Sequence, residues 1–460
     1  MKRIFAIARL TWKAAFRFRL FWVLAALLLG SVVVLPLLLK DDGTARGFIQ
    51  IMLTYTLSVI TALLGFSTLW LACGTLARDI EDCSMQMVVV KPIGRWQIWL
   101  GKFVGIMLLN AALLAVAGAG VYTLLQWRAT QLEPAQQRIL RNEIFVARAA
   151  LKEPMVDIEA AVNAAFARVP NRDSLTPEQQ QQTREQLRQV IKNKNQEVPP
   201  NNYRVWTLDL GLQKHLLGDK PLYLRVKFHV AATNESGTYL GLWTVGPYQS
   251  PLAFSQPQSL SADTFHEIPL SGGSQLLDDR GRLVVNFINQ NNTPLEFPLA
   301  DGLEVLYREG GFGLNFARGL AVILCWLALL AALGLASASL MSFPVAAFFS
   351  LSLLVVALSS GTLSTVVSEG TVTGLDHETG TGGGSLIDLV LVPFFSGLLS
   401  IVKLAQDFSP VEALSTGRSI TWGQLARAFG QIVLLLGGLF ALAGITCFTR
   451  RELAATQPHS

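Results

Sequence analysis

The sequence has little charge. Asp, Glu, Lys and Arg make up 15% of its 460 residues, whereas soluble domains average about 25%. Apolar residues account for 51%, and several uninterrupted apolar runs approach about 20 residues, the helix length that crosses the roughly 30 Å core of a bilayer. The composition therefore excludes an ordinary soluble globular protein and predicts a polytopic α-helical membrane protein.

Catalytic and metal-binding signatures are also missing. The chain has four cysteines and five histidines, and none of them stands at metal-ligand spacing. It contains no G-x-x-x-x-G-K-[ST] phosphate loop, no G-x-S-x-G turn and no H-E-x-x-H helix. We therefore expect a subunit that is not itself an enzyme and that binds no cofactor or metal directly.

Six apolar segments have the length and composition of transmembrane helices. A further apolar segment, residues 386–403, is short and contains Asp388 and Pro393. We expect this segment to re-enter or lie at the outer membrane surface; if it crossed, the number of spans would be seven. The six predicted spans are residues 21–39, 51–76, 100–126, 320–341, 345–367 and 432–448.

The distribution of Lys and Arg predicts the orientation. Residues 2–19 contain six basic residues and no acidic one, which places the N-terminus in the cytoplasm. Residues 1–20 also fit an amphipathic helix that lies along the membrane surface and contacts anionic lipids; a solvated basic leader is the alternative. Six spans put both termini in the cytoplasm, in agreement with Arg450 and Arg451, and predict a bacterial inner-membrane protein.

A polar region, residues 128–315, separates the third span from the fourth. With this topology it is a periplasmic domain of about 190 residues. Residues 132–197 predict two or three helices, and residues 203–310 predict short strands between turns, which is typical of an antiparallel β-sandwich. The whole insertion is thus an α+β domain.

The charge of this domain is balanced. Residues 128–309 hold 19 Lys and Arg and 20 Asp and Glu, which argues against nucleic-acid binding. The aromatic residues Trp206, Trp243 and Tyr248 suit a sugar or lipid ligand, but core packing explains them equally well. Docking of a periplasmic partner, ligand binding and a plain scaffold all remain open.

The cytoplasmic loop between the second and third spans, residues 77–95, has the pattern of a docking element. Acidic residues are expected to begin a short helix there, because carboxylates stabilise the positive end of the helix dipole. Apolar residues follow on a segment otherwise exposed to water, and a Lys-Pro pair ends it; a loop that merely rests on the bilayer is the alternative. The candidate docking residues are Asp79, Glu81, Asp82, Met85, Met87, Val88, Lys91 and Arg95.

At these residues the chain resembles the permease subunit of type-2 ABC transporters. The family pattern is an acidic start, a short coupling helix, a Lys-Pro-x-x-Arg turn and a Leu-Gly-Lys re-entry. Here these parts are residues 78–81, 82–90, 91–95 and 100–102, although Cys83-Ser84 replaces the usual Gly-Thr. Residues 408–414, 417–422 and 448–453 resemble the last outer loop and the Arg-Arg-Glu-Leu tail of the family.

The resemblance implies a permease with six helices per subunit that pairs with an identical or different second permease. It also implies separate ABC ATPase subunits, which bind ATP and Mg and dock on the coupling helix. The function expected is therefore ATP-driven export or movement of a substrate. The alternative is a non-transport membrane scaffold or sensor whose external domain binds a ligand or partner. The large insertion after the third span departs from the short outer loop usual in the family.

Overall fold

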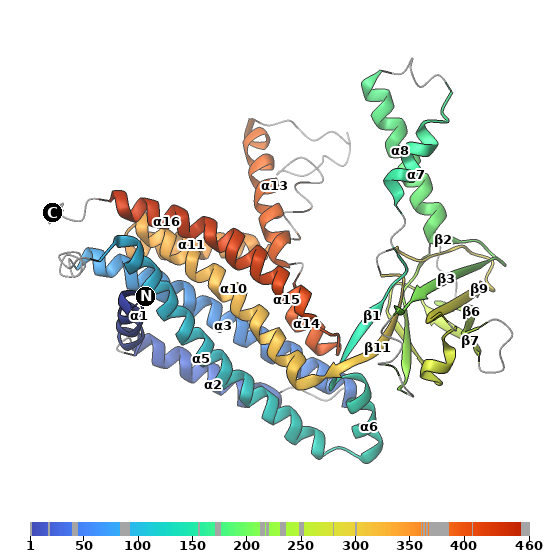
Figure 1. Cartoon of the computed structure of the whole chain (residues 1–460), viewed down its shortest axis with the longest axis horizontal. Helices are drawn as coiled ribbons and strands as arrows, with labels where there is room; N and C mark the ends of the chain where they lie inside the picture. The colour runs from blue at the N-terminus through green and yellow to red at the C-terminus, as the bar shows by residue number, and fades with distance from the viewer. Residues whose placement is uncertain are drawn as a thin grey trace. The chain divides into compact units, whose positions relative to one another are not determined.

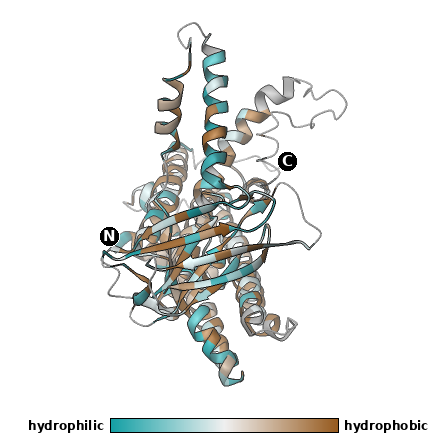
Figure 2. Cartoon of the chain, turned by 90° about the vertical axis from the view of Figure 1, so that its right-hand side faces the viewer, coloured by the Kyte–Doolittle hydropathy of each residue, from teal (hydrophilic) through white to brown (hydrophobic). Residues whose placement is uncertain are grey.

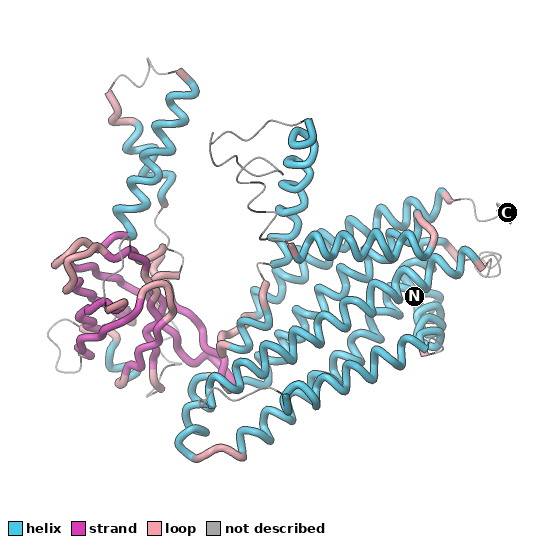
Figure 3. Tube along the Cα trace, turned by 180° about the vertical axis from the view of Figure 1, so that it is seen from behind, coloured by secondary structure: helices cyan, strands magenta, loops and turns pink. Residues whose placement is uncertain are grey.

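A computed structural model of the chain describes residues 2–16, 19–38, 45–82, 93–154, 157–170, 176–211, 217, 220–230, 236–247, 253–278, 280–299, 301–359, 361, 364, 367, 386–406 and 408–451. The chain forms two compact units. A helical unit contains residues 1–145 and 311–460, and a second unit contains residues 146–310. Figure 3 shows that the strands gather in the second unit, which also carries a helical hairpin.

The helical unit is a bundle in which α10 is central, because it packs along α3, α5 and α16. Gly334 of α10 lies against α3, where an added Cβ would meet the Ala72 side chain at 2.7 Å. The elements of the unit are α1 (Lys2–Ala15), α2 (Arg19–Leu38), α3 (Ala45–Glu81), α5 (Arg95–Thr130), α6 (Pro134–Glu143), α10 (Phe312–Leu340), α11 (Phe343–Leu358), α13 (Leu386–Gln406), α14 (Pro410–Ser415), α15 (Trp422–Ala428), the π-helical segment η4 (Phe429–Gly437) and α16 (Gly438–Arg450).

Four of the predicted spans are confirmed as helices that are long and apolar enough to cross a membrane. These helices are Ile49–Glu81, Arg95–Thr130, Phe312–Leu340 and Trp422–Arg450. The segments predicted at 21–39 and 345–367 contain shorter apolar helices, Trp22–Leu35 and Phe343–Leu358, and the residues between 368 and 385 lie outside the described part. Residues 386–403 fall in α13, a helix with Pro393 inside it.

The second unit contains two four-stranded sheets with a shared apolar core. One sheet has the order β1-β11-β4-β8, the other has the order β3-β9-β6-β7, and a small third sheet has the order β2-β10-β5. The elements are β1 (Val146–Leu151), α7 (Ile158–Phe166), α8 (Pro177–Gln196), β2 (Glu197–Val198), β3 (Tyr203–Asp209), β4 (Leu222–Val226), β5 (His229–Val230), β6 (Thr238–Val245), β7 (Phe254–Ser261), β8 (His266–Leu270), η3 (Gly273–Leu276), β9 (Arg282–Asn289), β10 (Leu295–Glu296) and β11 (Leu303–Gly311).

Buried and more exposed side chains alternate along the strands, and the buried ones form the core of this unit. Along β9 the buried residues recur at every second position, and buried side chains of both four-stranded sheets belong to one apolar cluster. The strands are the more hydrophobic part of the unit, whereas α8 is mostly hydrophilic (Figure 2). A capping box at Thr176 starts α8, with Gln179 as its reciprocal partner. The antiparallel pairings of β3, β6, β7 and β9 confirm the predicted antiparallel sheet.

The boundary of the second unit differs from the expected 128–315. Helix α5 continues to Thr130, and Leu140 of α6 and Ile144 pack into the core of the helical unit. The sequence did not indicate this, because residues 132–143 have the polar composition of a soluble helix although Leu140 is buried. Two or three helices were expected in residues 132–197; the structure has α6, α7 and α8 there, and β1 stands between the first two.

Candidate functional site

The structure places the described candidate docking residues around one connection, that between α3 and α5. Asp79 and Glu81 lie in the last turn of α3, Asp82 follows it, and Arg95 is the first residue of α5. The other candidates lie outside the described residues: Met85, Met87, Val88 and Lys91.

The expectation that the acidic residues begin a short helix is wrong for Asp79 and Glu81. Both belong to the C-terminal turn of α3, where the helix dipole disfavours negative charge. Each carboxylate is compensated by a group on another helix instead. The sequence could not specify these partners, because they lie 23 and 262 positions further along the chain.

Asp79 pairs with Lys102, which lies two turns after the first residue of α5. The Lys102 ammonium nitrogen lies 2.5 Å from Oδ2 of Asp79 and donates a second hydrogen bond to the carbonyl oxygen of Thr75 at 2.6 Å. The Lys102 side chain is only 7% exposed, against 46% for Asp79. A buried lysine requires such partners, because an uncompensated ammonium is costly to remove from water. This contact therefore joins the end of α3 to the beginning of α5.

Glu81 compensates the positive end of a different helix. Its Oε1 accepts a hydrogen bond from the backbone N–H of Phe343, the first residue of α11, at 2.7 Å. The guanidinium of Arg78, one turn earlier in α3, lies 4.3 Å from the centre of the Phe343 ring. Residues near the end of α3 thus hold the N-terminus of α11 through both its backbone and its first side chain.

Arg95 contacts the C-terminal end of the last helix. Its Nη1 lies 3.1 Å from the carbonyl oxygen of Phe448 and 2.8 Å from those of Thr449 and Arg451. Carbonyl groups at a helix C-terminus lack intrahelical donors, and a cation there is favourable. In turn, Arg451 donates to the carbonyl oxygen of Ser339, close to the end of α10.

Helix α1 lies at the same end of the helical unit (Figure 1). Its buried residues include Ile7, Ala8 and Thr11, which pack against two glycines of α5. A Cβ on Gly101 would meet the Ile7 side chain at 2.6 Å, and one on Gly105 would meet the Ala8 carbonyl oxygen at 2.8 Å. The absence of side chains on α5 therefore allows α1 to approach closely, next to the turn that holds Lys102.

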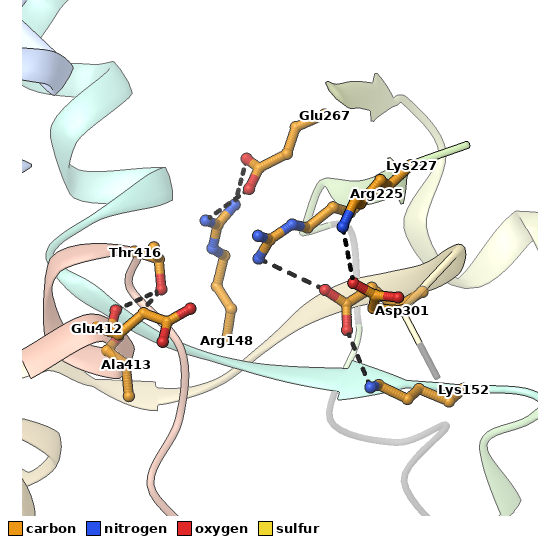
Figure 4. Close-up of polar contacts among 10 residues, drawn as sticks. Arg148, Lys152, Arg225, Lys227, Glu267, Asp301, Glu412, Ala413 and Thr416 are labelled. Atoms are coloured by element: carbon orange, nitrogen blue, oxygen red, sulfur yellow. Dashed lines mark hydrogen bonds and ion pairs between the residues drawn. The ribbon is translucent and has the colours of Figure 1, made fainter. Parts of the chain in front are cut away.

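The second unit contains a separate group of charged residues on the β1-β11-β4-β8 sheet (Figure 4). Glu304 stands directly across from Arg225, and Arg225 stands across from Glu267. Arg148 donates to both carboxylate oxygens of Glu267, at 3.0 and 3.3 Å. Positive and negative side chains therefore alternate across the sheet, an arrangement that compensates charge rather than one that exposes a reactive group.

The aromatic residues considered as ligand contacts are part of the core of this unit. Trp206 is 3% exposed and Trp243 is 1% exposed, and Phe297 contacts both rings edge-on. Tyr248 lies outside the described residues. Within the described part of the chain, no group of three or more His, Cys, Asp or Glu side chains is placed to hold a metal ion.

The geometry identifies residues that the motif alone did not select as site residues. Lys102, Phe343 and Arg451 complete the contacts of Asp79, Glu81 and Arg95. Lys102 lies in the Leu-Gly-Lys motif and Arg451 in the Arg-Arg-Glu-Leu tail, so the sequence held a signal for these two residues but none for Phe343. In comparisons with family models, curated proteins and solved structures, nothing matches this chain.

Proposed function

We propose that the chain is the membrane-spanning permease subunit of an ATP-driven ABC transporter. Separate ATPase subunits, which bind ATP and Mg, dock on the connection between α3 and α5. Their closure on ATP displaces this connection and biases the helical unit between two arrangements. The chain itself performs no catalysis in this scheme, and a second permease of the same or another kind completes the membrane part.

The observation that carries the proposal is the convergence of helix ends on one connection. The last turn of α3 and the first turns of α5 contact the start of α11 through Glu81 and the end of α16 through Arg95. A protein bound at this connection therefore acts on helices from both halves of the chain. A mere surface loop, anchored by its own two helices, would not require these contacts.

The proposed topology has six spans. The four long apolar helices are supplemented by α2 and α11, while α13 re-enters from the outer side. The docking connection, α1 and both termini then face the cytoplasm of a bacterium, and the second unit faces the periplasm. There it receives the substrate or passes it to a periplasmic partner. Anionic lipids contact the basic residues of α1, which include Lys2, Arg9 and Lys13.

Affinity purification of the intact chain from its native host in mild detergent tests the proposal. We expect an ABC ATPase among the retained proteins. A double variant, Met85→Asp with Val88→Asp, should lose it. The matched control places the same two charges in the second unit, as Val190→Asp with Val205→Asp, at side chains that are 63% and 46% exposed; this control should retain the ATPase.

The outcome separates the two functions under consideration. Retention of an ATPase by the control but not by the docking variant supports the permease. Reproducible absence of any ATPase from the folded wild-type chain would instead favour the membrane scaffold or sensor.

A further inference from the structure

The α3–α5 connection, residues 82–94, is bracketed by two oppositely charged residues. Glu81 precedes it as the last residue of α3, and Arg95 follows it as the first residue of α5. Both residues extend away from their own helices to a helix end in the second half of the chain. These two contacts define a clamp, which consists of Glu81 on α11 and Arg95 on α16.

The Glu81 contact replaces a cap that α11 does not have locally. Ser342 occupies the N-cap position of α11, but its side chain makes no capping hydrogen bond. The first N–H groups of a helix need an acceptor, and a carboxylate suits the positive end of the dipole. Glu81 supplies both, because its Oε1 lies 2.7 Å from the Phe343 nitrogen. The first turn of α11 is therefore held by a residue of α3.

The Arg95 contact provides donors for the carbonyl groups at the C-terminus of α16. Three carbonyl oxygens at the end of α16 lie within hydrogen-bonding distance of a single guanidinium nitrogen. The interaction combines hydrogen bonding with the attraction between a cation and the negative end of a helix. The end of α16 is therefore held by a residue of α5.

The two parts of the clamp are mechanically connected by the Asp79–Lys102 ion pair. Lys102 lies two turns after Arg95, and Asp79 lies two residues before Glu81, so their contact at 2.5 Å fixes the end of α3 against the beginning of α5. The Lys102 side chain is almost completely buried, which makes this link expensive to break. A movement of the end of α3 is thus passed to the beginning of α5, and the reverse.

We infer that Glu81 and Arg95 are positioning residues, which convert a displacement of the α3–α5 connection into movement of α11 and α16. The inference rests on the proposed function in one respect, namely that a docked ATPase provides the displacement. The clamp itself belongs to the isolated chain and is testable without a partner. Its distinguishing property is that weakening one contact loosens both distant helix ends.

Hydrogen exchange of the full chain in lipid nanodiscs, followed by mass spectrometry, tests this property. Glu81→Ala and Arg95→Gln are compared with the wild type in two regions, residues 343–347 and 446–451. Loss of a hydrogen bond to a charged group should accelerate exchange at the directly contacted end by about tenfold or more. Coupling through the clamp should accelerate exchange at the other end by about threefold.

Matched controls separate the clamp from general loosening. Glu81→Gln keeps an oxygen that accepts from the Phe343 N–H, and it should largely preserve protection at both ends. Arg450→Gln removes an exposed arginine beside the same carbonyl groups and should leave residues 343–347 unchanged. If Arg95→Gln loses protection throughout α5, the milder Arg95→Lys replaces it in the same comparison.

The clamp is refuted if each variant accelerates exchange only at its own helix end, because the contacts are then independent caps. This result is distinct from failure of the proposed function. A wild-type chain that retains no ATPase but shows exchange effects at both ends refutes the function and keeps the clamp. A chain that retains an ATPase but shows only local effects refutes the clamp alone.

Discussion

Among the charged residues of the β1-β11-β4-β8 sheet, Glu304 allows the sharpest prediction about stability. Its carboxylate is completely buried, with Arg225 at 3.5 Å and Lys152 at 3.9 Å. The Arg225 side chain is itself only 9% exposed. The nearly isosteric Glu304→Gln change therefore removes the negative charge and leaves a guanidinium buried without its main counter-charge.

Removal of one partner from a buried ion pair costs about 3–5 kcal/mol. An exposed pair contributes about 0–1 kcal/mol, and the same end of the sheet provides a more exposed, half-buried pair for comparison. Lys227 and Asp301 lie 3.5 Å apart, with side chains that are 22% and 37% exposed. We therefore expect Glu304→Gln to destabilise the second unit by several kcal/mol and Asp301→Asn to have little effect.

The assay is hydrogen exchange of β4 and β11 in the full chain over a urea series, since these strands carry Arg225 and Glu304. The midpoint of the exposure transition should fall strongly for Glu304→Gln and hardly at all for Asp301→Asn. A double variant with apolar residues, Glu304→Leu with Arg225→Met, should recover much of the loss because neither member of this pair then leaves an uncompensated buried charge. Equal midpoints for Glu304→Gln and Asp301→Asn would refute the reasoning.

Three further outcomes are expected. Gly105→Leu should detach α1, because a Cβ at this position would lie 2.8 Å from the carbonyl oxygen of Ala8, and hydrogen exchange of α1 should become faster. Gly438→Leu is the control: no atom lies within 4 Å of a Cβ there, and exchange of α1 should be unchanged. Lys102→Met should lower the free energy of local opening at the end of α3 by about 1–3 kcal/mol, because the hydrogen bonds of Lys102 to Thr75 and Asp79 are lost. Faster hydrogen exchange at the end of α3 would show this. Hydrogen bonds from the backbone and side chain of Arg282 lower the pKa of Asp278 below its usual range. The stability that this contributes is present above the pKa of the unfolded state and is lost as the pH falls through the pKa of the folded state. Asp278→Asn should therefore make the unfolding midpoint fall less steeply at acidic pH.

Periodicity predicted the parts of this fold that depend on local sequence. Long apolar runs identified the four membrane-length helices, and alternation identified the strands of the sandwich. The edges of the second unit were harder to predict, because β7 contains Pro257 and several polar residues, and because α6 buries Leu140 in the helical unit despite its polar composition. In such segments tertiary contacts, rather than local preference, determine the structure.

The docking role of the candidate site stays a prediction, and the contacts of its described residues were not predicted. The acidic residues and Arg95 were identified from their spacing, but the charges were assigned to the dipole of the wrong helix. Asp79 and Glu81 end α3 and act on α5 and α11, which no local pattern can indicate. A carboxylate at the C-terminal turn of a long helix is unfavourable by itself, so its presence is a signal that a positive partner lies elsewhere in the fold.

The last helix shows how a π-helical segment keeps one row of residues buried against a neighbouring helix. Buried residues recur at every fourth position along it, at Ala428, Ile432, Leu436, Gly444 and Phe448, and the partly buried Phe440 fills the position between Leu436 and Gly444. In a regular α-helix, four residues turn about 40° beyond a full circle, so 20 residues would carry this row roughly 200° around the helix. The π-helical segment η4 has wider turns, with i→i+5 hydrogen bonds, and it counteracts this drift while the helix packs along α10. A strict four-residue period over five steps is therefore incompatible with a straight α-helix against a straight partner, and it predicts either a π segment or a departure of the helix from its neighbour.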